Sequence, residues 1–335
     1  MISIAACILS LAAVLSLPLL AHADISGAVI SVSISPENPV EGGSLTGACS
    51  ANNSSGVTSL QYQWHKDDVA NISGSIVFGS SISSGELHTC AIRANDSAVL
   101  CWGSNQFGEL GDGTTTDHYT PTQINSTDAF TSLSSGSYHS CAIRANDSSI
   151  LCWGYNVYGQ LGDGTTASSY NPVKVNDASN FTRVSTSGGH TCAIRANDSA
   201  VLCWGRNENG ELGDGTATEH YTPAQINSTS AFASISSGSA FSCAIRANDS
   251  RVLCWGDNSK GQLGDGTTGA INSKPNPTPI NDTSAFSSIS LGDYHACAIR
   301  ANDSRVLCWG TNEQGQLGDG TAIDAPNPAL VNDTS

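Results

Sequence analysis

Cysteine is the residue type whose spacing gives the clearest chemical signal in this chain. Ten of the twelve cysteines form five pairs, and each pair has ten residues between its members. The pairs are Cys90 and Cys101, Cys141 and Cys152, Cys192 and Cys203, Cys243 and Cys254, and Cys297 and Cys308. Such thiols can form a disulfide or supply half of a structural zinc site, which needs four ligands. No second pair lies near any of them, so disulfides are favoured and zinc is the alternative.

Acidic and imidazole side chains also recur, and each set has a metal-binding and a structural interpretation. The aspartates of the Leu-Gly-Asp-Gly-Thr sequences are Asp112, Asp163, Asp214, Asp265 and Asp319. These sequences lack the alternating ligands and the twelfth-position glutamate of an EF-hand, so turn formation is favoured over calcium binding. The histidines two residues before a first cysteine are His88, His139, His190 and His295. Because Phe241 takes the fifth such position, a structural contact is favoured over metal ligation, and we predict neither a metal nor a cofactor.

The sequence contains no motif that predicts catalysis. An active site needs an asymmetric group of residues, and no Gly-x-Ser-x-Gly elbow, phosphate loop or unique carboxylate pair is present. The chain is therefore predicted not to be an enzyme. The segments that vary between repeats follow Trp-Gly and Gly-Asp-Gly-Thr, as expected of loops that bind a partner. The aromatic and arginine residues predicted to contact a partner are Phe107, Tyr119, Tyr155, Tyr158, Arg206 and Tyr221.

Asparagines in Asn-x-Ser/Thr sequences form a further set. Those in Asn-Asp-Ser are Asn95, Asn146, Asn197, Asn248 and Asn302, and others lie at Asn125, Asn227 and Asn281. These sequences fit N-glycosylation at the surface of an exported chain. They equally fit tight turns, which asparagine and aspartate favour, and both interpretations stay open.

A tandem repeat must position all of these residues. The sequence Cys-Ala-Ile-Arg-Ala-Asn-Asp-Ser begins at each first cysteine, and the starting points are 51, 51, 51 and 54 residues apart. Four short strands are predicted in each unit, and in the second unit they are Pro121–Asn125, Phe130–Ser135, His139–Ala145 and Ser149–Trp153. Four strands in a period of about 50 residues are typical of a β-propeller blade.

The third and fourth predicted strands should form a hairpin around Asn-Asp, whose residues tolerate a left-handed backbone. Counting outward from this turn pairs Ile92 with Val99, and Cys90 with Cys101. Facing residues of antiparallel strands lie within disulfide distance. Both faces of the hairpin are apolar, which indicates that each blade is covered on both sides by its neighbours.

The repeat resembles that of the regulator of chromosome condensation family. The resemblance rests on His88–Ile92, Leu100–Gly103 and Asn105–Gly111, and it recurs in all five units over about three quarters of the chain. It implies an all-β propeller of four-stranded blades. That family is known for seven-bladed propellers, whereas this chain has five units.

Closure of the ring is predicted from the strand inventory. The first unit lacks a strand upstream, and Pro328–Asn332 supplies an unpaired strand at the other end. Exchange of this strand would complete the first blade and remove exposed edges. We therefore predict a closed ring of five blades; the alternatives are an open arc and a truncated seven-bladed type.

The segment before the repeats has two predicted parts. Residues 1–23 resemble a cleaved signal peptide ending in Ala-His-Ala, and a retained membrane anchor is the alternative. Residues 24–76 resemble part of an immunoglobulin-like domain, with Cys49 and Trp64 at core positions, or else form a linker. Residues 77–335 form the propeller.

Composition limits the function further. The formal net charge of −16, with 13 lysines and arginines, argues against nucleic-acid binding. Paired cysteines after a signal peptide indicate an extracellular or cell-surface location. We predict an exported, non-catalytic binding or scaffold protein whose loops contact a protein or a cell-surface glycan. The resemblance implies two alternatives, which are a guanine-nucleotide exchange factor for a small GTPase and a secreted inhibitor of the β-lactamase-inhibitor type.

Overall fold

The computed structural model describes residues 76–332 continuously, and before them only the backbone of five short strands. The chain divides into two compact units, Met1–Ile76 and Val77–Ser335. Most of the predicted signal peptide, residues 4–23, lies outside the described residues. In the part of the chain that the structure describes, no helix has the length and apolar character needed to cross a membrane.

The first unit contains two small antiparallel sheets. One pairs β1 (Ile2–Ser3) with β2 (Asp24–Ile25). The other has the order β3 (Val29–Ser35), β4 (Leu45–Asn52) and β5 (Leu60–Trp64). The immunoglobulin-like assignment of residues 24–76 stays a prediction.

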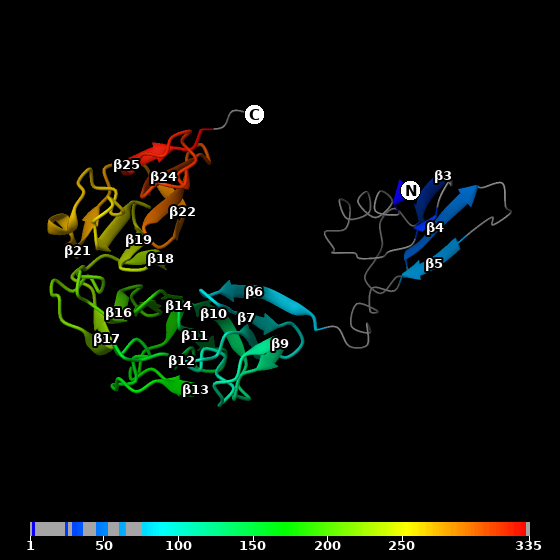
Figure 1. Ribbon diagram of the computed structural model, residues 1–335, viewed down its shortest axis with the longest axis horizontal. Helices are drawn as coiled ribbons and strands as arrows, with labels where there is room; N and C mark the ends of the chain where they lie inside the picture. The colour runs from blue at the N-terminus through cyan, green and yellow to red at the C-terminus, as the bar shows by residue number, and fades with distance from the viewer. Residues whose placement is uncertain are drawn as a thin grey trace. The chain divides into compact units, whose positions relative to one another are not determined.

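The second unit consists of five four-stranded antiparallel sheets, which we call blades 1 to 5 (Figure 1). Blade 1 contains β6 (Phe78–Ser84), β7 (His88–Arg93), β8 (Val99–Gly103) and β9 (His118–Gln123). Blade 2 contains β10 (Phe130–Ser135), β11 (His139–Arg144), β12 (Ile150–Gly154) and β13 (Ser169–Lys174). Blade 3 contains β14 (Phe181–Thr186), β15 (His190–Arg195), β16 (Val201–Gly205) and β17 (His220–Gln225). Blade 4 contains β18 (Phe232–Ser237), β19 (Phe241–Arg246), β20 (Val252–Gly256), the 3-10 turn η2 (Ala270–Asn272) and β21 (Lys274–Pro279). Blade 5 contains β22 (Phe286–Leu291), β23 (His295–Arg300), β24 (Val306–Gly310) and β25 (Ala325–Leu330).

The predicted hairpin register is confirmed in every blade. In blade 1, Cys90 pairs with Cys101 and Ile92 with Val99. All five predicted disulfides are present, each with a Cα–Cα distance of 4.1 Å. The prediction that Asn-Asp adopts the left-handed backbone was wrong in position, because that conformation falls on the following serine, with φ of 58° at Ser97. Asp96 supports the turn instead, since its carboxylate accepts a hydrogen bond from the Ala98 amide at 3.2 Å.

The grouping of strands into blades differs from the prediction. The segment expected to begin the second blade at Pro121 belongs to β9, which pairs with β8 and completes blade 1. At the other end, β25 pairs with β24 and completes blade 5. The predicted exchange of Pro328–Asn332 into the first blade is therefore wrong, because each blade is built from one continuous segment.

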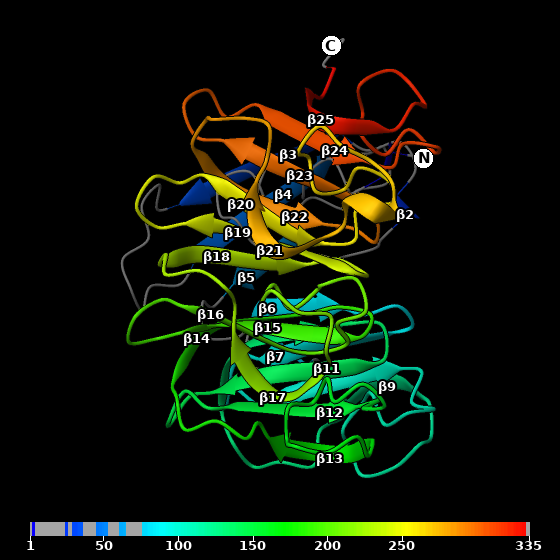
Figure 2. The ribbon, with the colours of Figure 1, turned by 90° about the vertical axis from the view of Figure 1, so that its left-hand side faces the viewer.

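Each blade has two apolar faces, and neighbouring blades cover both faces of blades 2, 3 and 4 and one face of blades 1 and 5. The disulfide face carries both cysteines with residues such as Ile92 and Val99, and the tryptophan face carries an alanine, a leucine and the tryptophan of Cys-Trp-Gly. At each junction the disulfide face of one blade packs against the tryptophan face of the next, so Cys90 shares a core with Leu151 and Trp153. The other three junctions repeat this arrangement. Figure 2 shows the sheets of blades 3, 4 and 5 stacked in chain order.

The five blades form an open arc. In Figure 1 the first blade (cyan) and the last blade (red) lie at separate ends of the arc. Ile82, on the tryptophan face of blade 1, is equivalent to Leu133 of blade 2. Ile82 is 65% exposed, whereas Leu133 is 9% exposed. Val306, on the disulfide face of blade 5, is equivalent to Val99 of blade 1. Val306 is 37% exposed, whereas Val99 is fully buried. The predicted closed ring is therefore wrong, and the alternative of an open arc agrees with the structure.

Antiparallel pairing places the loops of each blade on two opposite surfaces. First strands of neighbouring blades, such as β6, β10 and β14, contact one another and lie innermost. Connections from the first to the second strand and from the third to the fourth emerge on one surface, which we call the aromatic surface. The Asn-Asp turns, between second and third strands, emerge on the opposite surface.

Candidate partner-binding surface

Five side chains from three blades form a continuous cluster on the aromatic surface. Phe107 lies 5.5 Å from Tyr138 and 5.0 Å from Tyr155 between ring centroids, and all these contacts are edge-to-face. Tyr155 lies 6.4 Å from Tyr158, and the Arg206 guanidinium lies 5.7 Å from the centre of the Tyr158 ring. We call these five residues the aromatic cluster. Phe107 is 36% exposed and the others are partly exposed, so the rings pack together and still face solvent.

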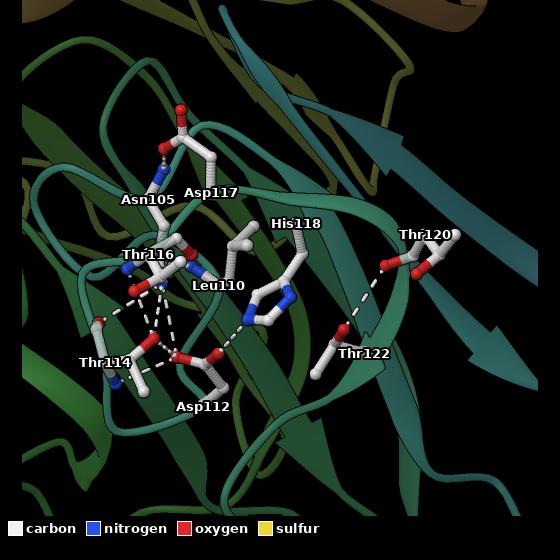
Figure 3. Close-up of polar contacts among 9 residues, drawn as sticks. All are labelled: Asn105, Leu110, Asp112, Thr114, Thr116, Asp117, His118, Thr120 and Thr122. Carbon is white, nitrogen blue, oxygen red and sulfur yellow. Dashed lines mark hydrogen bonds and ion pairs between the residues drawn. The ribbon is translucent and has the colours of Figure 1, made fainter.

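Buried asparagines fix the loops that carry Phe107, Tyr158 and Arg206, and Figure 3 shows the one in blade 1, Asn105. In blade 1, the Asn105 side-chain NH₂ donates to Asp112 Oδ1 at 3.2 Å and to the Thr116 carbonyl at 3.0 Å. Its side-chain oxygen accepts from the Leu110 amide at 3.0 Å. One fully buried side chain thus ties together three parts of the loop between the third and fourth strands. Phe107 is held in a defined position because it lies within this loop.

The same arrangement recurs in the other blades. The equivalent asparagines, all fully buried, are Asn105, Asn156, Asn207, Asn258 and Asn312. Sequence reasoning included Asn105 in the repeat motif but assigned these asparagines no role, because an asparagine in a loop normally indicates only a turn. Their recurrence at one position after each Trp-Gly, in loops that otherwise vary, was the signal that could have indicated a structural role.

The aspartate of Leu-Gly-Asp-Gly-Thr takes part in this loop network. Asp112 Oδ1 accepts from the Thr114 amide at 2.9 Å, and Oδ2 lies 2.7 Å from His118 Nε2. Burial opposes ionisation, but hydrogen bonds from Thr114, Asn105 and His118 lower the pKa of Asp112. Both carboxylate oxygens are engaged by protein groups, which supports the turn interpretation. Within residues that the structure describes, no group of three potential ligands could hold a metal ion.

Acidic groups surround the arginine end of the cluster. Arg206 Nε lies 3.1 Å from Glu208 and 3.8 Å from Glu211, which is fully buried. Burial raises the pKa of Glu211. Partial burial of Arg206 acts to lower its pKa, but the carboxylates of Glu208 and Glu211 outweigh this effect and raise the pKa of Arg206. At the other end, the hydrogen bond to Glu86 raises the pKa of Tyr138.

The structure brings together four of the six predicted partner-binding residues. Tyr119 and Tyr221 lie elsewhere, on the outer strands β9 and β17. Tyr221 packs against Gly159 of the preceding blade, whereas Tyr119 is 92% exposed. Tyr138 was missed, because it lies in the turn before a second strand rather than in the loops that were compared.

The Asn-Asp-Ser asparagines lie on the surface opposite the aromatic cluster. All five are exposed at the turns between second and third strands. This placement is compatible with glycosylation and with a purely structural turn, so their modification stays a prediction.

Three predicted structural histidines connect neighbouring blades. Hydrogen bonds join His88 Nε2 to Ser140 at 2.8 Å, His139 to Thr191 at 2.9 Å, and His190 to Ser242 at 2.7 Å. All three imidazoles are buried. Burial lowers the pKa of His88 to about 4, and burial with neighbouring positive charge lowers those of His139 and His190 to about 3.

These histidines predict that acid destabilises the five-blade unit. Below the ordinary pKa of 6.5 the unfolded chain binds protons that the folded chain excludes. Stability should therefore fall as the pH drops from 6.5 towards 4, by about 1.4 kcal/mol per pH unit for each buried histidine. Denaturant unfolding across this range measures the slope. The double variant His139→Phe, Thr191→Ala copies the natural Phe241–Ala296 pair and should show a shallower slope; an unchanged slope would contradict this assignment.

The fold and the surface define the class of protein: an all-β, disulfide-bonded repeat protein with propeller-type blades and a cluster of aromatic side chains on one surface. The RCC1-like domain model matches residues 47–335, and the chain belongs to this family. The chain is 28% identical over 256 residues to the ultraviolet-B receptor UVR8 of Arabidopsis thaliana, covering 75% of this chain and 57% of UVR8. It is 27% identical to the human E3 ubiquitin-protein ligase HERC2 over 75% of this chain and 5% of HERC2. The chain thus spans about half of one relative and a small part of the other.

A solved structure shows the same fold. Prp20p from Saccharomyces cerevisiae, described with its binding to Gsp1p and histones, matches with a TM-score of 0.67 at 18% identity. The match covers 88% of this chain and 76% of Prp20p. At this identity the likeness establishes the fold alone.

Proposed function

We propose that this chain is an exported, non-catalytic protein that binds a protein partner through the aromatic cluster. The observation that carries the proposal is the cluster itself, in which four aromatic rings and one arginine from three blades meet on one surface. Aromatic residues and arginine contribute most of the binding energy in many protein interfaces. Exposed rings that already pack together lose little conformational freedom on binding.

The rigidity of the supporting loops favours this proposal. The buried asparagines Asn105, Asn156 and Asn207 hold the loops of the three contributing blades. A surface that is already ordered avoids much of the entropic cost of association. The exposed carboxylates of Glu86 and Glu208 lie beside the cluster, so a partner with basic side chains around an apolar centre fits this surface best.

Two further observations support the proposal. Five disulfides fit an oxidising compartment and therefore export. The Prp20p structure is described with protein partners, which is a precedent for protein binding by this fold.

Alanine substitutions in the cluster should weaken partner binding. With the secreted chain immobilised, a protein captured from surface extracts would be identified and then titrated against Tyr155→Ala and Arg206→Ala variants. Each substitution should raise Kd about fivefold or more, because such anchors typically contribute over 1 kcal/mol. Tyr294→Ala is the matched control, since Tyr294 occupies the turn position of Tyr138 in blade 5 and should leave Kd unchanged.

Three outcomes would contradict the proposal. Equal binding by the wild type and both cluster variants would remove the cluster from the interface. Binding that survives proteolysis of the extract and is lost after periodate oxidation would indicate a glycan ligand. Stimulated nucleotide release from a small GTPase would favour an exchange factor.

A further inference from the structure

The four internal junctions share a contact made by tryptophan. The indole N–H of each later blade donates to a backbone carbonyl of the blade before it. The bonds are Trp153 to Glu109 at 2.7 Å, Trp204 to Gln160 at 2.9 Å, Trp255 to Glu211 at 2.8 Å and Trp309 to Gln262 at 2.9 Å. Each ring also lies against a glycine, and a Cβ at Gly111 would approach Trp153 to 2.7 Å. The disulfide face therefore offers a seat shaped for an indole.

A second shared contact lies farther out. At the first junction the Gly113 amide donates to the Tyr170 carbonyl at 2.8 Å, and the Tyr170 ring packs over Gly108. The equivalent amides at the other junctions donate to Tyr221, Pro275 and Pro326 at 2.8 to 2.9 Å. Tyrosine or proline thus fills this outer seat at every internal junction.

The third contact, between a second strand and the second strand of the next blade, joins a histidine to a serine or threonine at three junctions. At the fourth junction the two positions hold Phe241 and Ala296, both buried. Both partners differ together there, so the residue on one face matches the residue on the other.

Among the residues that the structure describes, no blade covers the disulfide-face half of this interface on the last blade. A Cβ at Gly315, where the outer seat lies, would meet only the Thr321 carbonyl at 3.9 Å. Ile299 is 39% exposed and Val306 is 37% exposed, although their counterparts in the other blades are buried. We call this face the tail end; it also carries His295, which is only partly buried.

The first blade presents the tryptophan-face half. Tyr119, at the position that fills the outer seat elsewhere, is 92% exposed, and Ile82 is 65% exposed. Trp102, at the position of the buried indoles, is partly exposed. We call this face the head end. It carries Thr89 at the repeat position of Thr191, which is hydrogen-bonded to a histidine of the neighbouring blade. Thr89 is therefore the residue that could form the same hydrogen bond with His295 of a tail end.

We propose that the head end of one copy of this chain binds the tail end of another. The argument is continuity with the interface already repeated four times in each copy: Trp102 and Tyr119 would occupy the seats at Gly318 and Gly315. His295 would meet Thr89 as His139 meets Thr191. Burial of two exposed apolar faces provides the driving force.

The symmetry of this contact has a consequence for the size of the assembly. Head-to-tail association is heterologous, and it closes only if the rotation between copies completes a ring. Two copies in one plane would contribute ten blades, more than the roughly four to eight of closed propellers. Successive copies must therefore rise along the axis, and growth is open-ended.

Sedimentation velocity of the full chain tests the proposal. The weight-average mass should rise with concentration past twice the monomer mass of 34.4 kDa. The variant Ile82→Arg, Tyr119→Arg blocks the head end, and Ile299→Arg, Val306→Arg blocks the tail end. Each should stay monomeric alone, and an equimolar mixture should form a one-to-one dimer, because one copy retains a tail and the other a head.

The mixture also tests folding, since only correctly folded ends can restore the junction. Ile271→Arg is the matched control: Ile271 is 95% exposed in η2, away from both ends, and its replacement should leave assembly unchanged. A wild type that stays monomeric at high concentration would overturn the proposal. So would assembly that persists in either blocked variant, or a mixture of folded blocked variants that forms no dimer.

Discussion

Reduction of the five disulfides should abolish the folded state of the repeat unit at temperatures where the oxidised protein is stable. Each bridge closes a loop of twelve residues and restricts the unfolded chain, which is worth about 2–3 kcal/mol. Five such contributions together are comparable to the roughly 5–15 kcal/mol that stabilises a typical domain. Thermal unfolding with and without reductant, followed by circular dichroism, measures the difference.

A single bridge gives the matched comparison. The pair variant Cys192→Ala, Cys203→Ala, in the central blade, should lower the free energy of unfolding by about 2–3 kcal/mol and leave the other blades folded. If the reduced protein unfolded at the same temperature as the oxidised one, the bridges would not be important for stability.

Replacement of a buried junction tryptophan should have the largest effect of any single substitution. Trp204 is fully buried, and its indole donates to the Gln160 carbonyl at 2.9 Å. Trp204→Ala removes this bond and leaves a cavity between blades 2 and 3, at a cost of about 3–5 kcal/mol. Chemical denaturation of the dilute, monomeric chain measures the loss.

Trp102→Ala is the control for this prediction. Trp102 occupies the same repeat position, but within the described part of the chain no blade covers it, and its ring lies 5.7 Å from that of Phe78 between centroids. Its replacement should cost clearly less than that of Trp204 in the monomer. If both variants lost the same free energy of unfolding, packing between blades would add little to stability.

The sequence was sufficient to predict the strand register within each hairpin. The distance from the Asn-Asp turn set the pairing of Cys90 with Cys101, because a short turn leaves few registers in which both faces stay apolar. The same alternation predicted that each blade is covered on both sides, which the shared cores confirm for blades 2, 3 and 4. The prediction was wrong for the outward faces of blades 1 and 5, where Ile82 and Val306 are exposed.

Contacts that depend on neighbouring blades were harder to predict from the sequence. The strand at Pro121 could be assigned to the unit before or after it, since strand patterns do not reveal which sheet edge a strand joins. Ring closure depends on the angle between blades, which no single repeat encodes. The aromatic cluster joins Tyr138 to Phe107 across a junction, so only the three-dimensional arrangement reveals it.

The building of each blade from one continuous segment also determines how the chain can acquire its structure during synthesis. Every sheet and every sulfur bridge is complete once about fifty residues have emerged, because no strand waits for a distant partner. Short-range contacts of this kind form rapidly. Successive blades can therefore form in order from the amino-terminal side, and each finished blade offers its disulfide face as the template on which the next one condenses.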